Sequence, residues 1–289
     1  MEKQFSLQMI REKSKSFQVP YENMLIGCAK ERILDRFLNE GKTPEKETYV
    51  FSGVVGLGIE RYRYSKDRTL ELKVPAETLT ETHFNEFKKF GCTEEDGGWQ
   101  IRWIKKESAE AVLEIEVPFE KIRIPITLII AASQARKGVT QKVSLPLCYE
   151  NDRYLEIPCF YPEAELAEAF VEFWERLELI WDISHLEYMY LMGKTFALDG
   201  RRLSEYLDQS LRAHNMTVST ERCAQVFACE KNAHLKKRWK SYLSKEKRRE
   251  PQWEEVMETI ENLYEPVVQM LCKEEIFFGD WMPAVGRYL

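Results

Sequence analysis

The sequence predicts an α+β protein, with N-terminal helices and a sheet domain over residues 1–160 and a helical bundle over residues 161–289. Between residues 49 and 160, apolar residues alternate with the period of two that strands require. From Pro162 onward they recur at helical spacing almost without interruption. With 289 residues and 44% hydrophobic content, the chain is long enough to bury a substantial core.

The elements of the first half follow from local patterns. Apolar residues from Met24 to Leu38 recur at helical spacing, so we expect the opening helix to continue through Pro20 to about Asn39. A polar helix is expected from Thr80 to Phe90, and residues 92–98 form a hairpin or surface loop. Strands are expected near 49–53, 68–74, 99–104, 111–117, 121–130, 143–147 and 154–157.

The second half has four clear helical signals. The ranges 166–177 and 183–190 each carry one apolar face. Asp199 is placed as the cap of a further helix through Leu211. Residues 253–271 have the cleanest amphipathic pattern in the chain.

Residues 49–74 are the most informative segment, because they predict a strand, a glycine turn, a short helix and a second strand. Ser52, Gly53 and Gly56 lie at the turn, where glycine lets backbone N–H groups approach a phosphate closely. Glycine at such a turn also serves simply to permit a tight bend. Both interpretations remain open from the sequence.

The second strand carries Glu71 and Lys73, which lie two residues apart and therefore share one face. Two carboxylates at this spacing can share a divalent metal, but a lysine holds the second position. Glu71 could bind a metal weakly, and Lys73 could form an ion pair with it or hold a phosphate directly. Arg68 and Thr69 just before them form a basic and hydroxyl pair that could grip a phosphate.

In their order along the chain, several segments resemble the AbiEii/AbiGii toxin family of nucleotidyltransferases. They are residues 8–38, 49–74, 157–168, 181–185, 239–243 and 253–266. The resemblance implies a nucleotidyltransferase-like mixed sheet domain with N-terminal helices and a helical C-terminal domain. It also implies a nucleotide as ligand, tRNA, other RNA or a protein hydroxyl as acceptor, and an antitoxin or phage-defence protein as partner.

The positions that would carry chemistry depart from the family. Lys73 replaces a carboxylate, the strand from Ile124 to Ala131 has no acidic residue, and Ala169 stands where the family has a lysine. Asp182 matches one aspartate of the family, and His185 replaces the other. We therefore expect a pseudoenzyme that acts by binding, with no cofactor or with weak Mg²⁺ and NTP. The alternative is an active metal-dependent nucleotidyltransferase toxin with Glu71 as the remaining ligand.

Asp182 and His185 are three residues apart on a predicted helix and so share a face. They could act as a general base with its orienting carboxylate, or they could serve structural hydrogen bonding. The glutamates of the preceding helix are expected to form a solvated face. They are Glu163, Glu165, Glu168 and Glu172.

A basic segment stands out in a chain of net charge −6. Its aromatic residues, Trp239 and Tyr242, suggest bases stacking beside an RNA backbone. The alternative is a solvated helix face and the docking surface of an acidic partner. The predicted patch consists of Lys236, Lys237, Arg238, Trp239, Lys240, Lys247, Arg248 and Arg249.

The chain has no apolar run of membrane length and no charged-then-apolar leader, so we expect a cytoplasmic protein that does not enter a membrane. Its seven cysteines are irregularly spaced and lack the spacings of zinc ligands. We expect them to be buried thiols in a reducing compartment.

Overall fold

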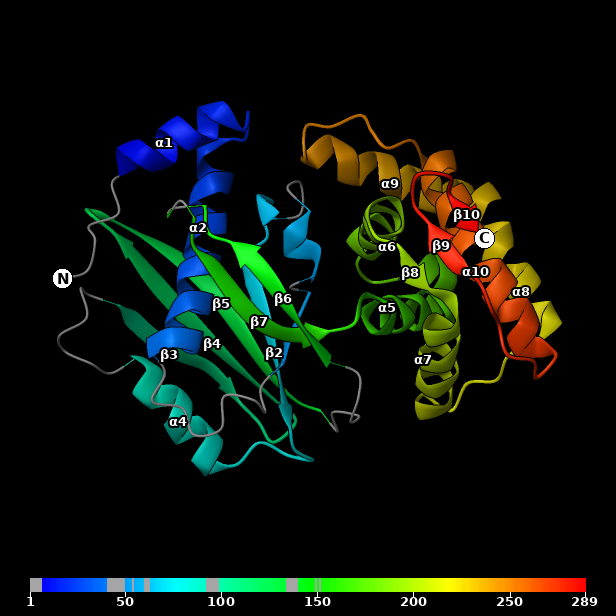
Figure 1. Ribbon diagram of the computed structural model, residues 1–289, viewed down its shortest axis with the longest axis horizontal. Coiled ribbons are helices and arrows are strands. Elements are labelled where there is room, and N and C mark those ends of the chain that lie inside the picture. Colours follow the sequence, from blue (N-terminus) through cyan, green and yellow to red (C-terminus); the bar gives the residue numbers. More distant parts are fainter. Residues whose placement is uncertain are drawn as a thin grey trace. The chain divides into compact units, whose positions relative to one another are not determined.

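The computed structural model of the chain describes residues 7–40, 50–53, 55–59, 63–91, 99–133, 140–148, 150 and 152–289. The chain divides into two compact units, Met1–Phe160 and Tyr161–Leu289, which we call the sheet unit and the helical unit. The first contains a seven-stranded sheet, and the second contains helices and a small three-stranded sheet (Figure 1). The predicted α+β class is confirmed.

The N-terminal segment forms two helices, α1 (Leu7–Ser16) and α2 (Tyr21–Asp35), and α2 continues into a π-helical turn, η1 (Arg36–Glu40). The expectation of one helix running through Pro20 is wrong. Gln18 has a φ of 54°, which ends α1. Pro20 then precedes the first residue of α2, where its missing N–H group breaks no helical hydrogen bond.

The sheet has the strand order β3-β4-β5-β2-β1-β7-β6. The β2/β5 and β1/β7 pairs are parallel and the others are antiparallel. The strands are β1 (Val50–Ser52), β2 (Thr69–Pro75), β3 (Gln100–Lys106), β4 (Glu110–Phe119), β5 (Ile122–Ser133), β6 (Thr140–Pro146) and β7 (Tyr154–Phe160). A short 3₁₀ helix, η2 (Val55–Gly58), follows β1. The predicted loop at 92–98 lies outside the described residues.

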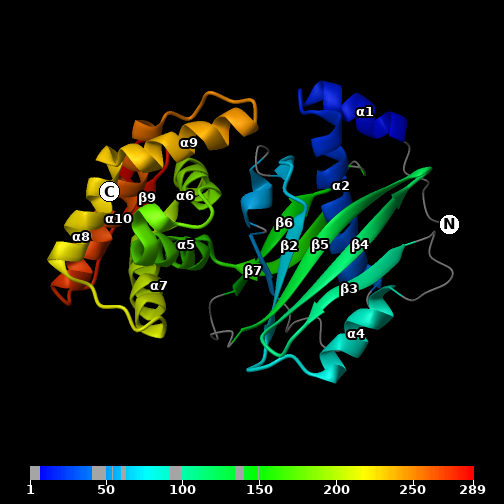
Figure 2. The ribbon, with the colours of Figure 1, turned by 180° about the vertical axis from the view of Figure 1, so that it is seen from behind.

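The two faces of the sheet differ as the alternating pattern predicts. Along β4, buried residues such as Leu113 and Ile115 alternate with half-buried ones such as Glu114. Helix α2 lies across the apolar face and contacts β4, β5 and β7 (Figure 2). Helix α4 (Glu81–Gly91) packs beside β3, where the rings of Phe84 and Trp103 meet edge to face at 5.4 Å.

The middle of helix α2 is buried on all sides, because every residue from Met24 to Leu34 is buried. Three consecutive charged residues, Lys30, Glu31 and Arg32, belong to this buried stretch. Buried charges are tolerated where they are paired and hydrogen-bonded. Their partners therefore determine how α2 is attached to the rest of the unit.

The helical unit is built around α10, which contacts α6, α7, α8 and α9. At its centre the rings of Phe170 and Tyr264 stack with centroids 4.0 Å apart. Asp199 caps α7 as predicted, since its Oδ1 accepts a hydrogen bond from the Arg202 N–H at 2.9 Å. The helices are α5 (Pro162–Arg176), η3 (Leu177–Leu179), α6 (Ser184–Thr195), α7 (Gly200–Ala213), α8 (Thr220–Phe227), η4 (Ala228–Lys231), α9 (Ala233–Lys245) and α10 (Trp253–Cys272).

Three short strands interrupt the expected run of helices in this unit. They are β8 (Leu198–Asp199), β9 (Asp280–Met282) and β10 (Arg287–Tyr288), paired antiparallel in the order β10-β9-β8. Trp281 of β9 is fully buried, and its Nε1 donates to the Gly193 carbonyl at 2.6 Å. Strands of two or three residues carry too few side chains for an alternating pattern to be recognised.

The six cysteines among the described residues are free thiols, and five of them are buried. No described helix combines the length and the apolar character needed to cross a bilayer.

Candidate functional site

The glycine turn follows β1 directly. Gly53 has a φ of 71°, a left-handed conformation that glycine adopts without steric cost. Gly56 is buried within η2. The predicted sequence of strand, glycine turn, short helix and second strand is therefore observed, and the turn at Gly53 requires a glycine for its backbone conformation.

The register between β1 and β2 brings the predicted residues of this region together. Ser52 lies opposite Glu71, and Val50 lies opposite Lys73. Because side chains two apart share a face, Ser52, Glu71 and Lys73 lie on the same side of the sheet. The Lys73 ammonium donates to Oε1 of Glu71, and their side chains remain 26% and 36% exposed.

The neighbouring strand supplies no further carboxylate at this point. In the parallel β2/β5 register, Ile129 lies beside Glu71 and Ala131 beside Lys73. Within the described part of the chain, no group of three or more His, Cys, Asp or Glu residues could hold a metal ion. One carboxylate that is already paired with an amine does not fit a two-metal site, which needs several acidic oxygens.

The Glu71–Lys73 pair belongs to a wider pattern of ion pairs on the half-exposed face of the sheet. Arg102 pairs with Glu114 across the β3/β4 ladder at 2.6 Å. Arg123 lies 3.8 Å from Glu116 across the β4/β5 ladder. Cross-strand ion pairs of this kind stabilise a sheet modestly. A structural role for the Glu71–Lys73 pair is therefore the simplest alternative to a binding role.

The segment before β2 is held by the N-terminal helices. Arg68 Nη2 donates to Glu22 of α2 at 3.0 Å. The Asp67 carboxylate accepts a hydrogen bond from the Thr69 N–H at 3.0 Å and pairs with the Lys30 ammonium at 2.8 Å. Both Arg68 and Thr69, predicted to bind phosphate, thus lie at a turn that α2 fixes.

Lys30 of α2 is an unusual partner for this turn, because its side chain is only 3% exposed while that of Asp67 is 46% exposed. Burial lowers the pKa of the Lys30 ammonium below its ordinary value, although Asp67 acts in the opposite direction. In the folded protein the amine therefore releases its proton more readily than in the unfolded chain.

We expect the Lys30→Met variant to be as stable as the wild type at pH 7, or more stable by up to about 2 kcal/mol, because a buried amine is exchanged for apolar packing. As pH rises toward 10.5, the unfolded chain binds more protons at Lys30 than the folded one. The free energy of unfolding of the wild type therefore increases relative to that of the variant. Urea unfolding across this pH range tests both effects, with Lys121→Met at an exposed position as control. A clear loss of stability in Lys30→Met at pH 7 would show that the pair is net stabilising.

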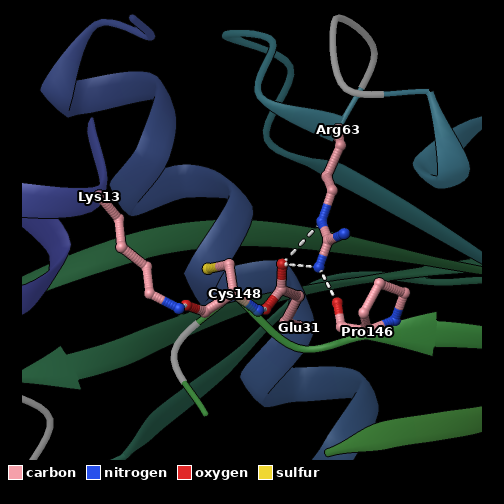
Figure 3. Close-up of polar contacts among 5 residues, drawn as sticks. All are labelled: Lys13, Glu31, Arg63, Pro146 and Cys148. Atoms are coloured by element: carbon pink, nitrogen blue, oxygen red, sulfur yellow. Dashed lines mark hydrogen bonds and ion pairs between the residues drawn. The ribbon is translucent and has the colours of Figure 1, made fainter. Parts of the chain in front are cut away.

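A buried polar cluster not predicted from the sequence lies between α2, the segment before β2 and the end of β6 (Figure 3). Oε1 of Glu31 accepts two hydrogen bonds from Arg63, from Nε at 2.8 Å and from Nη2 at 2.5 Å. Its Oε2 accepts the Cys148 N–H at 2.7 Å. Arg63 also donates to the Pro146 carbonyl, and Lys13 donates to the Cys148 carbonyl.

This cluster has no activated nucleophile. The neighbouring Cys28 thiol and burial raise the pKa of the Cys148 thiol, so it stays protonated at neutral pH. Each carboxylate oxygen of Glu31 is bound by donors from elsewhere in the unit. The cluster is therefore a structural junction that fixes α2 to the segment before β2 and to the end of β6.

In the helical unit, the structure gives Asp182 and His185 different partners. Oδ1 of Asp182 accepts the Ser184 N–H at 2.9 Å, as a residue preceding a helix often does. His185 Nδ1 pairs instead with the Glu172 carboxylate of α5. The two residues are thus engaged in local and interhelical hydrogen bonds, which is the structural alternative considered for them.

The prediction of a solvated glutamate face on α5 is wrong for the first two glutamates, whereas Glu168 is exposed and Glu172 is half-buried. Glu163 and Glu165 are 2% and 8% exposed. Glu163 accepts the Asp199 N–H at 2.8 Å, and Glu165 accepts the hydroxyl of Tyr188. The spacing of these glutamates in the sequence does not indicate their burial, because the groups that donate hydrogen bonds to them come from α6 and from the start of α7.

The predicted RNA patch also needs correction, because Trp239 is not available for stacking. Trp239 is 1% exposed, and its Nε1 donates to the Pro251 carbonyl at 3.0 Å. The Tyr242 hydroxyl donates to Glu187, and burial together with this carboxylate raises the pKa of Tyr242. Trp239 belongs to the core of the helical unit.

Three of the predicted basic residues have partners inside the unit. Arg248 binds Glu187 through two nitrogens, at 2.6 and 2.8 Å. Lys236 pairs with Glu254. Arg238 donates to backbone carbonyls after α5. The remaining members of the patch, Lys237, Lys240, Lys247 and Arg249, are exposed.

No protein-family model matches the sequence, and no curated protein is significantly similar to it. Among solved structures, the fold is similar to that of MenT4, a nucleotidyltransferase toxin from Mycobacterium tuberculosis. The identity is 13%, the match covers 70% of this chain and 71% of that chain, and the TM-score is 0.49. JHP933 from Helicobacter pylori matches with 10% identity, 89% and 94% coverage, and a TM-score of 0.47. Likeness at these identities concerns the fold and does not assign an activity.

Proposed function

We propose that this chain is a nucleotidyltransferase-fold protein that binds a nucleotide without transferring it. The observation that carries the proposal is the ion pair between Glu71 and Lys73. The ammonium group of Lys73 holds the position at which a second carboxylate would bind metal, and the β5 residues beside Glu71 and Lys73 are Ile129 and Ala131. An amine here attracts a phosphate group and repels Mg²⁺.

The proposed phosphate site consists of the Gly53 turn, Ser52 and Lys73. Ser52 lies across from Glu71 in the β1/β2 ladder, so its hydroxyl is on the same face as the ammonium. The left-handed conformation of Gly53 turns the chain directly after Ser52. In this site, Glu71 competes with the phosphate for Lys73.

Two substitutions at Glu71 and Lys73 distinguish binding from catalysis. In Glu71→Gln the ammonium loses its competing carboxylate, so we expect nucleotide affinity to rise about two- to fivefold. We expect Lys73→Ala to weaken binding about tenfold. Calorimetry of the full chain with each NTP, in Mg²⁺ and in EDTA, measures these effects, and Lys121→Ala serves as an exposed lysine control.

An active enzyme predicts the opposite sign at Glu71. Metal-dependent binding that Glu71→Gln abolishes, together with transfer of labelled nucleotide to total RNA or protein, would overturn the proposal. Binding that is equal in Mg²⁺ and EDTA, without label transfer, supports it. Failure of all four NTPs to bind would also reject it.

The biological setting we propose is a toxin–antitoxin or phage-defence system. This rests on the resemblance of the segments between residues 8 and 266 to the AbiEii/AbiGii family. Coexpression with the product of the neighbouring gene, followed by measurement of growth and phage plaques, tests the setting separately from nucleotide binding.

A further inference from the structure

The turn after α5, residues 177–182, exposes two large apolar side chains that lie two residues apart in the sequence. We call it the Trp181 turn. Leu179 is 74% exposed and Trp181 is 78% exposed, whereas Ile180 between them is buried. Single exposed apolar residues are common, but two of them on one fixed turn form a candidate contact surface.

Helix α9 holds this turn in place. The Arg238 guanidinium donates to the carbonyls of Glu178 at 2.9 Å, Ile180 at 2.6 Å and Trp181 at 3.2 Å. Through these three bonds the planar guanidinium of Arg238 fixes the backbone of the turn at three carbonyl groups. Leu179 and Trp181 are therefore presented on a rigid support, which lowers the entropy cost of binding a partner.

Two further features fix the conformation of the turn. Leu177 has a φ of 48°, which is strained for a leucine. The Arg176 guanidinium lies 5.4 Å from the ring centroid of Trp181, in the range of a cation–π contact. The Trp181 ring remains exposed to solvent although it contacts the Arg176 guanidinium.

The exposed basic side chains of the segment lie on α9 and directly after it. Lys245 follows Arg238 by seven residues, or about two helical turns, so it shares the face of α9 that binds the turn. In the described part of the chain, none of them forms an ion pair. They are Lys237, Lys240, Lys245, Lys247 and Arg249.

We propose that α9 and the Trp181 turn form a docking surface for an acidic segment of a partner protein, with apolar residues of that segment covering Leu179 and Trp181. The carboxylates of Glu178 and Asp182 lie in the same turn and are exposed. A protein segment can place its acidic residues over α9 and its apolar residues over the turn. A nucleic acid carries a charge at every phosphate and could not avoid these two carboxylates.

A display library of random short peptides, selected on the full chain and counter-selected on Trp181→Ala, tests the proposal. We expect the enriched peptides to combine acidic with aromatic or aliphatic residues. Fluorescence polarisation of the best peptide should show a loss of affinity of about tenfold in Trp181→Ala. Phe278→Ala, which removes another exposed aromatic ring of the same unit, should leave the affinity unchanged.

Charge is tested separately with Lys245→Glu, which should weaken the peptide about threefold or more, against Lys273→Glu as control. Enriched peptides that lack acidic residues, or that bind the wild type and Trp181→Ala equally tightly, would overturn the proposal. The absence of any enriched peptide would also overturn it. If a single-stranded RNA oligonucleotide binds more tightly than the best peptide, and this binding depends on Trp181, the surface binds nucleic acid and the proposal of a protein partner is overturned. These outcomes do not depend on nucleotide binding by the sheet unit.

Discussion

Replacement of Glu31 by alanine is expected to lower the free energy of unfolding by about 3–5 kcal/mol, because it leaves a buried charge without its partner. The side chains of Glu31 and Arg63 are 1% and 11% exposed, so neither charge can be hydrated without opening the unit. The Cys148 N–H would also lose its acceptor. Urea unfolding of the full chain, followed by tryptophan fluorescence, measures the loss.

The matched control is Glu22→Ala, which removes another glutamate of α2 that is paired with an arginine. Its side chain is 69% exposed, and we expect a loss below about 1 kcal/mol. The double variant Glu31→Leu with Arg63→Met removes both charges and should recover most of the stability. Equal losses in Glu31→Ala and Glu22→Ala would contradict the assignment of Glu31 to a buried junction.

Trp239→Ala is expected to cost the helical unit about 3–5 kcal/mol, since it removes a buried aromatic side chain and leaves a cavity. The ring lies 5.4 Å from that of Tyr242 and 6.3 Å from that of Trp253, and its N–H group satisfies the Pro251 carbonyl. Thermal and urea unfolding measure the effect.

Trp181→Ala provides the comparison, because that ring is 78% exposed and its loss should change stability by less than about 0.5 kcal/mol. Nucleic-acid binding that disappears in Trp239→Ala while the variant keeps wild-type stability would contradict the core assignment. Together the two variants separate the tryptophan that folds the unit from the one proposed to contact a partner.

Patterns local in sequence predicted the sheet elements and part of the site. Alternation along β4 and β5 identified the strands, and the spacing of Glu71 and Lys73 was enough to predict that they share a face and can pair. Asp199 was predicted as a helix cap because its partner is only three residues away. In each case the interacting groups belong to one element or to its immediate flank.

The features that sequence reasoning missed depend on partners far along the chain. Glu31 lies 32 residues from Arg63 and 117 from Cys148, and no local spacing joins them. Trp239 sits among lysines and arginines, so its neighbours suggested an exposed face, but its packing partner Trp253 comes from the next helix. Similarly, the acidic residues at the start of α5 are buried by hydroxyl and N–H donors that other helices supply.

The consecutive charges of α2 have a consequence for any shortened version of this protein. Lys30 reaches Asp67, Glu31 reaches Arg63, and Arg32 reaches the carbonyl of Pro118 at the end of β4. A fragment that starts at β1 would keep Asp67, Arg63 and Pro118 but would lose the three α2 side chains that bind them. The N-terminal helices are therefore an internal scaffold of the sheet, and trimming them should yield insoluble material rather than a smaller binding module.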